Sequence, residues 1–181
     1  MRIEPATPED LAEIQAAYED ARFKQQNLGA IVWPEFTEAQ ILAEIDTRHL
    51  FRVVAGDAIS GVFSIATEDP AIWGAYERGA HLYLHRIARA ARHPGRGLMD
   101  GILAWAEQRC ASLGREGLRM DTWASNTNLI AYYQRYGFRV VDERRLLADP
   151  RLPAHYHGNV FALLERACEP RMPRAELLER R

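Results

Sequence analysis

The sequence predicts an α/β fold with a central mixed β-sheet of about seven strands, flanked by about four helices. Apolar residues recur at helical spacing in four segments of the chain, and they alternate with polar residues in most of the segments between. These segments follow one another in the order β-α-α-β-β-β-α-β-α-β-β, which implies mixed strand directions.

Length and charge narrow the possible functions. The 181-residue chain is long enough to bury a substantial core, and we expect one domain over residues 1–168 followed by a charged C-terminal tail at 169–181. The formal net charge of −2 disfavours a nucleic-acid partner, because such binding needs a basic surface. No signal peptide is evident, and no apolar run approaches the ~20 residues of a membrane helix. We therefore expect a cytoplasmic protein without nucleic-acid or membrane partners; a homodimer is compatible with the sequence.

The first half of the chain is expected to hold two helices and, after an initial short strand, three further strands. A capping sequence at residues 7–10 opens a helix that extends to about residue 26, and Thr37 opens a second helix by the same logic. Alternation on both sides of a Gly-Asp turn predicts a β-hairpin over residues 51–65, and residues 81–88 are expected to form the next strand.

The second half is expected to contain a long helix, a strand, a short helix and two final strands, at residues 99–113, 118–122, 126–136, 138–141 and 160–164. Glycines follow both helices and are natural helix stops. The two cysteines, Cys110 and Cys168, lack metal-ligand or redox spacing. Cys110 falls in the apolar stripe of the long helix, so we expect it to be a small buried hydrophobe.

A glycine-rich turn joins the strand at 81–88 to the long helix and reads Pro94-Gly95-Arg96-Gly97-Leu98-Met99. Glycines here let the main chain approach a phosphate, whose charge is favoured by the free N–H groups and dipole of the helix start. The turn lacks the third glycine of a dinucleotide fingerprint and the Gly-Lys-Ser/Thr of a nucleotide P-loop. Taken alone, it also fits a plain turn before a helix.

A second segment is more specific, and it reads Asn126-Thr-Asn-Leu-Ile-Ala-Tyr-Tyr133-Gln-Arg-Tyr-Gly137-Phe138. Together with the glycine turn, it resembles the signature of the GNAT superfamily of N-acetyltransferases. The resemblance covers about residues 1–165 in element order and is specific between about 81 and 140. It implies a GNAT-like acyl-CoA N-acyltransferase fold and acetyl-CoA as the co-substrate.

The resemblance also implies where acetyl-CoA binds. In this superfamily the strand before the turn splays from its neighbour, and the pantetheine arm enters the gap and pairs with the strand main chain. The pyrophosphate then meets the start of the helix. By resemblance, the cofactor-binding residues are Ile87, Ala88, Arg89, Gly95, Arg96, Gly97, Leu98, Met99, Asn126 and Tyr133. Asn126 is a helix cap in either case.

Two alignments of the turn with the superfamily consensus are open. One places Arg92, Gly95 and Gly97 at the three key positions, and the other places Pro94, Gly97 and Met99 there. We prefer the second because it gives the following helix its expected length. Both alignments put the same stretch around the pyrophosphate. The arginines of this stretch either supplement the charge of the helix start or are solvated surface charges.

The expected chemistry needs a base and an acid. An amine must be neutral to attack a thioester, and deprotonating a lysine-like amine of pKa about 10.4 at pH 7 costs roughly 4–5 kcal/mol. The leaving thiolate in turn benefits from a proton donor. Tyr133 matches the position of the general acid in the superfamily. The alternative is a core aromatic residue on the same helical stripe as Leu129 and Ile130.

His85 is the candidate base. On an alternating strand His81, Tyr83, His85 and Ile87 share one face, and His85 lies close to the expected position of the thioester. The arrangement resembles some arylalkylamine acetyltransferases of the superfamily. The alternative is a half-buried histidine that bonds to neighbouring main chain. No acidic residue lies within residues 81–89, so we expect no carboxylate base on this strand.

Aromatic residues are expected to line the acceptor site. Trp33, Phe36 and Trp73 fall in loops that resemble the superfamily's substrate-binding region, and Tyr83 on the strand and Tyr156 in a later loop are assigned to the same site. Buried loop anchors would give the same pattern. His155 and His157 lack a third ligand at metal-binding spacing, so no metal is expected.

The sequence therefore predicts an N-acetyltransferase that moves an acetyl group from acetyl-CoA to the amine of a small molecule by direct attack in a ternary complex. Two alternatives are a non-catalytic acyl-CoA-binding module and an acetyltransferase that acts on a protein N-terminus. A tRNA acceptor is disfavoured because no basic stripe is evident.

Overall fold

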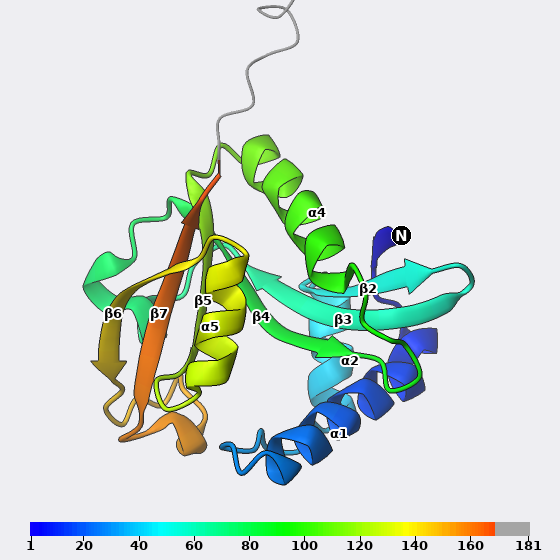
Figure 1. Ribbon diagram of the computed structural model, residues 1–181, viewed down its shortest axis with the longest axis horizontal. Helices are drawn as coiled ribbons and strands as arrows, with labels where there is room; N and C mark the ends of the chain where they lie inside the picture. Colours follow the sequence, from blue (N-terminus) through cyan, green and yellow to red (C-terminus); the bar gives the residue numbers. More distant parts are fainter. Residues whose placement is uncertain (169–181) are drawn as a thin grey trace, which may run out of the picture.

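Figure 1 shows the computed structural model, which describes residues 1–168. Seven strands form one sheet in the order β1-β2-β3-β4-β5-β7-β6. β4 and β5 are parallel, and every other neighbouring pair is antiparallel. The predicted mixed sheet is thereby confirmed, while the expected tail at 169–181 lies outside the described residues. The strands are β1 (Arg2–Pro5), β2 (Leu50–Ala55), β3 (Ala58–Ala66), β4 (His81–Arg89), β5 (Gly117–Trp123), β6 (Arg139–Arg145) and β7 (Val160–Ala167).

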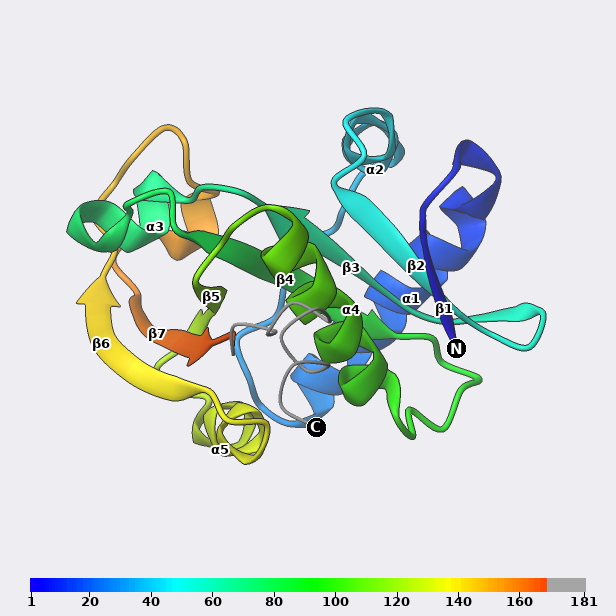
Figure 2. The ribbon, with the colours of Figure 1, turned by 90° about the horizontal axis from the view of Figure 1, so that it is seen from above.

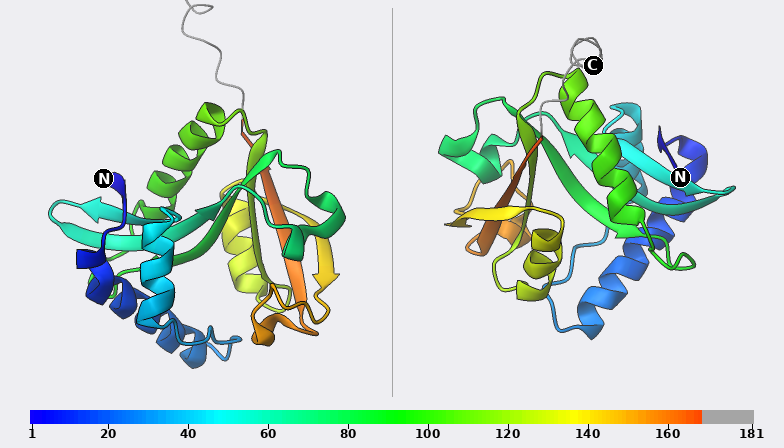
Figure 3. Two further views of the ribbon diagram at one scale, coloured as in Figure 1. Left: turned by 180° about the vertical axis from the view of Figure 1, so that it is seen from behind. Right: turned by 45° about the horizontal axis from the view of Figure 1, so that its top comes forward.

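Helices cover both faces of this sheet (Figure 2 and Figure 3). One face packs against α4 and α5, and the opposite face of the β1–β4 half packs against α1 and α2. No helix within residues 1–168 is both long and apolar enough to cross a membrane. The helices are α1 (Leu11–Asn27), α2 (Glu38–Asp46), α3 (Pro70–Trp73), α4 (Leu98–Ser112) and α5 (Thr127–Arg135).

The predicted caps begin the first two helices. The carboxylate of Asp10 accepts a hydrogen bond from the N–H of Thr7 at 2.7 Å, and the N–H of Gln40 donates to the Thr37 hydroxyl at 3.3 Å. Cys110 is fully buried in α4, as expected. The single-turn helix α3 was not predicted, because four residues are too few to show a helical period.

β4 and β5 separate along their length. They pair only over residues 81–83 and 117–119, although β4 continues to Arg89 and β5 to Trp123. Beyond the paired end the two strands diverge (Figure 1). The remainder of β4 therefore has a partner on its β3 side only, and its other edge faces a gap.

A β-bulge lies in the part of β4 that pairs with β3 but not with β5. Arg86 and Ile87 together stand opposite the single β3 residue Phe63, and Arg86 adopts a left-handed φ of 49°. The extra residue reverses the alternation of side chains, so Ile87 packs against the core under α4. The prediction that Ile87 shares a face with His85 is therefore wrong, because the sequence carries no signal for a bulge at an arginine.

Candidate functional site

A cavity of about 1380 Å³ occupies the gap between the diverging halves of β4 and β5. Its walls also include the start of α5, the connection between α1 and α2, and the loop that precedes β7. This volume exceeds the ~300–1,000 Å³ of a typical small-ligand site, so it has room for two ligands to meet. The predicted site residues that line it are Trp33, Phe36, His85, Ile87, Ala88, Arg89, Asn126, Tyr133 and Tyr156.

Trp73 and Tyr83 do not line this cavity, contrary to their assignment to the acceptor site. Both side chains are fully buried. The Tyr83 hydroxyl donates to the Glu77 carboxylate and accepts a hydrogen bond from Arg119 at 3.1 Å. The Arg119 guanidinium lies 4.2 Å from the centre of the Trp73 ring. Aromatic type alone did not distinguish these buried anchors from cavity residues.

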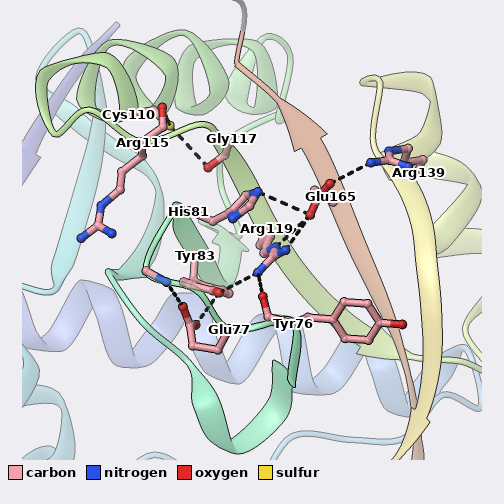
Figure 4. Close-up of polar contacts among 11 residues, drawn as sticks. Tyr76, Glu77, His81, Tyr83, Cys110, Arg115, Gly117, Arg119, Arg139 and Glu165 are labelled. Atoms are coloured by element: carbon pink, nitrogen blue, oxygen red, sulfur yellow. Dashed lines mark hydrogen bonds and ion pairs between the residues drawn. The ribbon is translucent and has the colours of Figure 1, made fainter. Parts of the chain in front are cut away.

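The network around Arg119 lies at the end where β4 and β5 pair (Figure 4). Arg119 donates to Glu165 of β7 at 2.8 and 3.0 Å and to the main-chain oxygen of Tyr76 at 2.8 Å. His81 lies 3.4 Å from the same carboxylate. This buried network joins three elements at the point from which the two strands diverge.

The glycine-rich turn follows the end of β4. Gly95 and Gly97 both have a left-handed φ, of 76° and 69°, a conformation that glycine adopts without steric cost. No heavy atom lies within 4 Å of the position that a Cβ on Gly97 would take. The side chains of Leu98 and Met99 are buried in the core, so these two residues offer a ligand their main chain.

The same turn lies next to the cavity without forming its wall. A Cβ on Gly95 would lie 2.5 Å from Cδ of Arg89, which does line the cavity. The N–H of Gly95 donates to Nδ1 of His93 at 3.0 Å, and the Arg89 guanidinium donates to the main-chain oxygen of His93. These contacts fix the turn against the open end of β4.

α5 carries Tyr133 to the opposite wall of the cavity. Asn126 caps this helix, as predicted, and its side-chain oxygen accepts a hydrogen bond from the N–H of Leu129 at 3.1 Å. Burial raises the pKa of Tyr133 well above its ordinary value, and Tyr132 and the carboxylate of Asp121 raise it further. The Tyr133 phenol therefore keeps its proton at neutral pH.

Two carboxylates flank His85, and neither was predicted from the sequence. Nε2 of His85 lies 3.6 Å from an Asp69 oxygen, and Nδ1 lies 3.6 Å from an Asp121 oxygen. The side chains of Asp69 and Asp121 are only 14% and 6% exposed. One oxygen of each accepts no hydrogen bond from the described residues. The carboxylates excluded from β4 thus reach His85 from the start of α3 and from β5.

Burial dominates the protonation of this cluster. It raises the pKa of Asp121 to about 7, with a contribution from the charge of Asp69, and it raises the pKa of Asp69 to about 6. Burial also lowers the pKa of His85 to about 4, and the positive charge of Arg86 adds to that shift. At neutral pH His85 is therefore neutral, and the titration of Asp121 is coupled to the charge of Asp69.

Aromatic rings form the outer walls of the cavity. Phe36 lies 4.7 Å from Tyr18 and 6.0 Å from Trp33, measured between ring centres. On the other side Tyr156 lies 4.7 Å from Phe161. Hydrogen bonds from Arg22 and to Gln25 at the end of α1 hold the main chain of Trp33. The walls thus offer flat apolar surfaces above the polar cluster.

Comparison with known proteins points to one family. A model of the acetyltransferase (GNAT) family matches residues 9–138. The N-acetyltransferase YesJ of Bacillus subtilis (strain 168) is 25% identical over 142 residues, which cover 74% of this chain and 79% of YesJ. The residues that match the family model include β4, the glycine-rich turn and α5.

Solved structures share the fold. A GNAT-family acetyltransferase from Listeria monocytogenes superposes with a TM-score of 0.70 at 20% identity, covering 92% of this chain and 94% of that chain. The structure of YncA from Salmonella typhimurium with its cofactor acetyl-CoA superposes with a TM-score of 0.62 at 14% identity, covering 96% of each chain.

Proposed function

This chain belongs to the GNAT family of acetyltransferases and is an acyltransferase, and we propose that it moves an acetyl group from acetyl-CoA to the amine of a small molecule by direct attack in a ternary complex. The carrying observation is the cavity between β4 and β5. One end of it adjoins a glycine-rich helix start, and its centre holds a buried acid–base cluster opposite a protonated tyrosine.

The residues at the open end of β4 fit acetyl-CoA. Ala90 donates its N–H to Ser60 of β3 at 3.0 Å, and main-chain groups of successive strand residues point to opposite edges. The main chain of Arg89, and by the same alternation that of Ile87, therefore faces the gap, where a pantetheine arm can pair with it. The likeness to YncA, whose structure includes acetyl-CoA, supports this choice of co-substrate.

The pyrophosphate fits the turn before α4. The first N–H groups of a helix have no partner within the helix and attract anions, and the space beside Gly97 is open. Arg92 and Arg96 are exposed in the same turn and add positive charge. When bound here, acetyl-CoA supplies an activated acetyl thioester at the centre of the cavity.

The cluster of Asp69, His85 and Asp121 takes the proton that the acceptor must lose. An acceptor amine arrives as an ammonium ion and becomes a nucleophile only after deprotonation. A base is most effective when its pKa lies near the working pH, and the pKa of Asp121 is raised to about 7. His85, the base expected from the sequence, is neutral and lies between the two carboxylates. The cluster therefore takes up the proton as a unit.

Tyr133 donates a proton to the departing thiolate of CoA. Its buried phenol is protonated at neutral pH, and it lines the cavity opposite β4. General acid catalysis of this kind contributes typically ~10²–10⁴-fold in rate. Tyr133 thus fits the role of the general acid, and the cluster of Asp69, His85 and Asp121 fits the role of the general base.

A thiol-release assay with acetyl-CoA and a panel of amines tests this function. Tyr133→Phe should lower kcat by ~10²–10⁴-fold while the Kd for CoA changes less than twofold. Tyr136→Phe is the matched control, because Tyr136 lies on the same turn of chain but does not line the cavity. A peptide with a free N-terminus belongs in the panel: preference for that peptide over every small amine would contradict the proposed acceptor class.

A further inference from the structure

We propose that Asp69 and Asp121 form a recognition site for the ammonium group of the acceptor, and that this acceptor is a primary amine on an apolar body without a carboxylate beside the amine. This inference rests on the proposed function and names the acceptor's chemical class. Four observations carry it: the unpartnered carboxylates, the engaged cations, the apolar walls and the spacing of the cluster.

The two carboxylates lack a cationic partner among the described residues. Oδ2 of Asp69 and Oδ1 of Asp121 are buried and accept no hydrogen bond, although both residues line the cavity. A buried carboxylate without a partner is costly to ionise. His85 provides no compensating charge, since burial keeps it neutral. An ammonium ion bound between these groups supplies the missing positive charge and hydrogen-bond donors.

Apart from Arg89 at the cofactor end, the Lys and Arg side chains that line the cavity already have acidic partners. Arg86 lies 2.5 Å from Glu44 and donates to Ser64 at 3.1 Å. The other two pair with neighbouring acids, Lys24 with Asp20 and Arg151 with Asp149. An amino-acid acceptor would bring a carboxylate next to its amine, and that carboxylate would face Asp69 and Asp121 with no free cation among these lining residues.

The walls above the carboxylates suit an apolar body. Trp33 and Phe36 on one side and Tyr156 and Phe161 on the other line the same cavity. Burial of an apolar group against such rings is favourable by roughly 25 cal/mol per Å². An aromatic or aliphatic amine therefore gains from its body at the walls and from its ammonium group at the cluster.

The spacing of the cluster suits an ammonium ion. One polar atom from each of Asp69, His85 and Asp121 lies within 4.8 Å of the other two. The centre of such a triangle is at most about 2.8 Å from each corner, so an ammonium ion there is within reach of charge-assisted N–H···O bonds to the carboxylates. Zinc bonds to nitrogen and oxygen are shorter, about 2.0–2.2 Å, so a titration with Zn²⁺ distinguishes the two occupants.

Calorimetric titration of the CoA-bound protein tests the proposal without relying on turnover. The probes are phenethylamine, phenylalanine, which adds a carboxylate, phenethyl alcohol, which lacks the charge, and n-butylamine. Phenethylamine should bind at least 100-fold more tightly than phenylalanine or the alcohol. Asp69→Asn and Asp121→Asn should each weaken its binding at least tenfold. Glu143→Gln on β6, an exposed acid outside the cavity, should leave it within twofold.

Specific results would overturn the proposal. Phenylalanine could bind as tightly as phenethylamine. Phenethylamine and n-butylamine could both fail to bind. Binding of phenethylamine could also persist in both Asp69→Asn and Asp121→Asn. A titration with Zn²⁺ alone is the remaining arm: micromolar or tighter binding that is lost in Asp121→Asn would identify a metal site instead. If phenethylamine binds through the carboxylates but no thiol is released from acetyl-CoA, the proposed function fails and the recognition site stands.

Discussion

Two buried polar clusters lie next to each other on the same pair of strands, and their hydrogen bonding differs. At the paired end, Tyr83 of β4 and Arg119 of β5 belong to a network in which all three guanidinium nitrogens donate (Figure 4). Two residues further along each strand stand His85 and Asp121, whose nearest atoms are 3.6 Å apart. The paired end is held by hydrogen bonds already made, whereas at the open end one oxygen each of Asp69 and Asp121 has no hydrogen-bond partner among the described residues.

The protonation of the acids follows the same division. Burial acts to raise the pKa of Glu165 at the paired end, but the hydrogen bonds and charge of Arg119 outweigh it and hold that pKa below its ordinary value. At the open end no cationic side chain offsets burial, only a main-chain hydrogen bond does so in part, and the pKa of Asp121 rises to about 7. Glu77 links the two clusters, because it accepts from Tyr83 and from the N–H of Asp69.

The largest expected effect comes from breaking the paired end. Arg119→Met leaves the largely buried carboxylate of Glu165 without its guanidinium partner and removes one of the two hydrogen bonds of the Tyr83 hydroxyl, which should lower the free energy of unfolding by about 3–5 kcal/mol. Urea denaturation measures this change. Arg139 bonds to the same carboxylate at 2.8 Å but is 73% exposed, so Arg139→Met should cost at most about 1 kcal/mol. Equal losses in the two variants would show that the buried network does not hold the paired end.

The glycine-rich turn gives the next largest effect, on cofactor affinity. Gly95→Glu introduces a negative charge and a Cβ that would clash with the flexible side chain of Arg89 and displace it, so the affinity for CoA should fall at least 100-fold while the fold is retained. Gly56→Glu in the β2–β3 turn is the control, because Gly56 also has a left-handed φ and has no heavy atom near its Cβ position. It shares the backbone strain and should bind CoA normally. Unchanged CoA affinity in Gly95→Glu would reject this turn as the pyrophosphate site.

Removing the charge of Asp121 should stabilise the protein at alkaline pH. The pKa of Asp121 in the folded state, about 7, lies above its ordinary value of 3.8, so the folded state binds more protons than the unfolded state between these pH values. Wild-type stability therefore falls as the pH rises through this window. Asp121→Asn does not titrate, so at pH 8 it should be more stable than wild type by up to about 4 kcal/mol.

The advantage of Asp121→Asn should shrink as the pH falls and approach zero only below the ordinary pKa of 3.8, where the wild-type carboxyl is protonated in both states. Thermal denaturation at pH 4, 6 and 8 measures this trend, and Asp142→Asn, a change to another acid of the sheet that is not fully buried, should show no such trend. A variant less stable than wild type at pH 8 would mean that Asp121 has a partner in the folded protein, which contradicts the division between the clusters.

Local sequence signals were sufficient for the fold and for the family. Caps at Thr7 and Thr37 set helix starts, and alternation revealed the hairpin of β2 and β3. The glycine turn and the segment from Asn126 to Phe138 pointed to the family, since each is a contiguous motif. Such signals depend on neighbours in the chain, which a single sequence displays directly.

The acceptor side depends on contacts that the sequence does not display. Asp69 and Asp121 are 52 positions apart, and only the divergence of β4 and β5 brings both to His85. The bulge at Arg86 changes which side chains share a face of β4. No glycine stands at this position to indicate a bulge from the sequence. Trp73 was assigned to the site by its aromatic type, but its side chain is fully buried and packs against the guanidinium of Arg119. Tertiary pairing, rather than local pattern, decides these positions.

The most direct test is a crystal structure of the protein with CoA and phenethylamine. The ammonium nitrogen should lie within hydrogen-bond distance of both Asp69 and Asp121, and the CoA sulfur should lie next to the Tyr133 hydroxyl between the diverging strands. An amine seated away from these carboxylates, or a gap between β4 and β5 that CoA does not enter, would contradict the view that the open end is kept unpaired for its ligands.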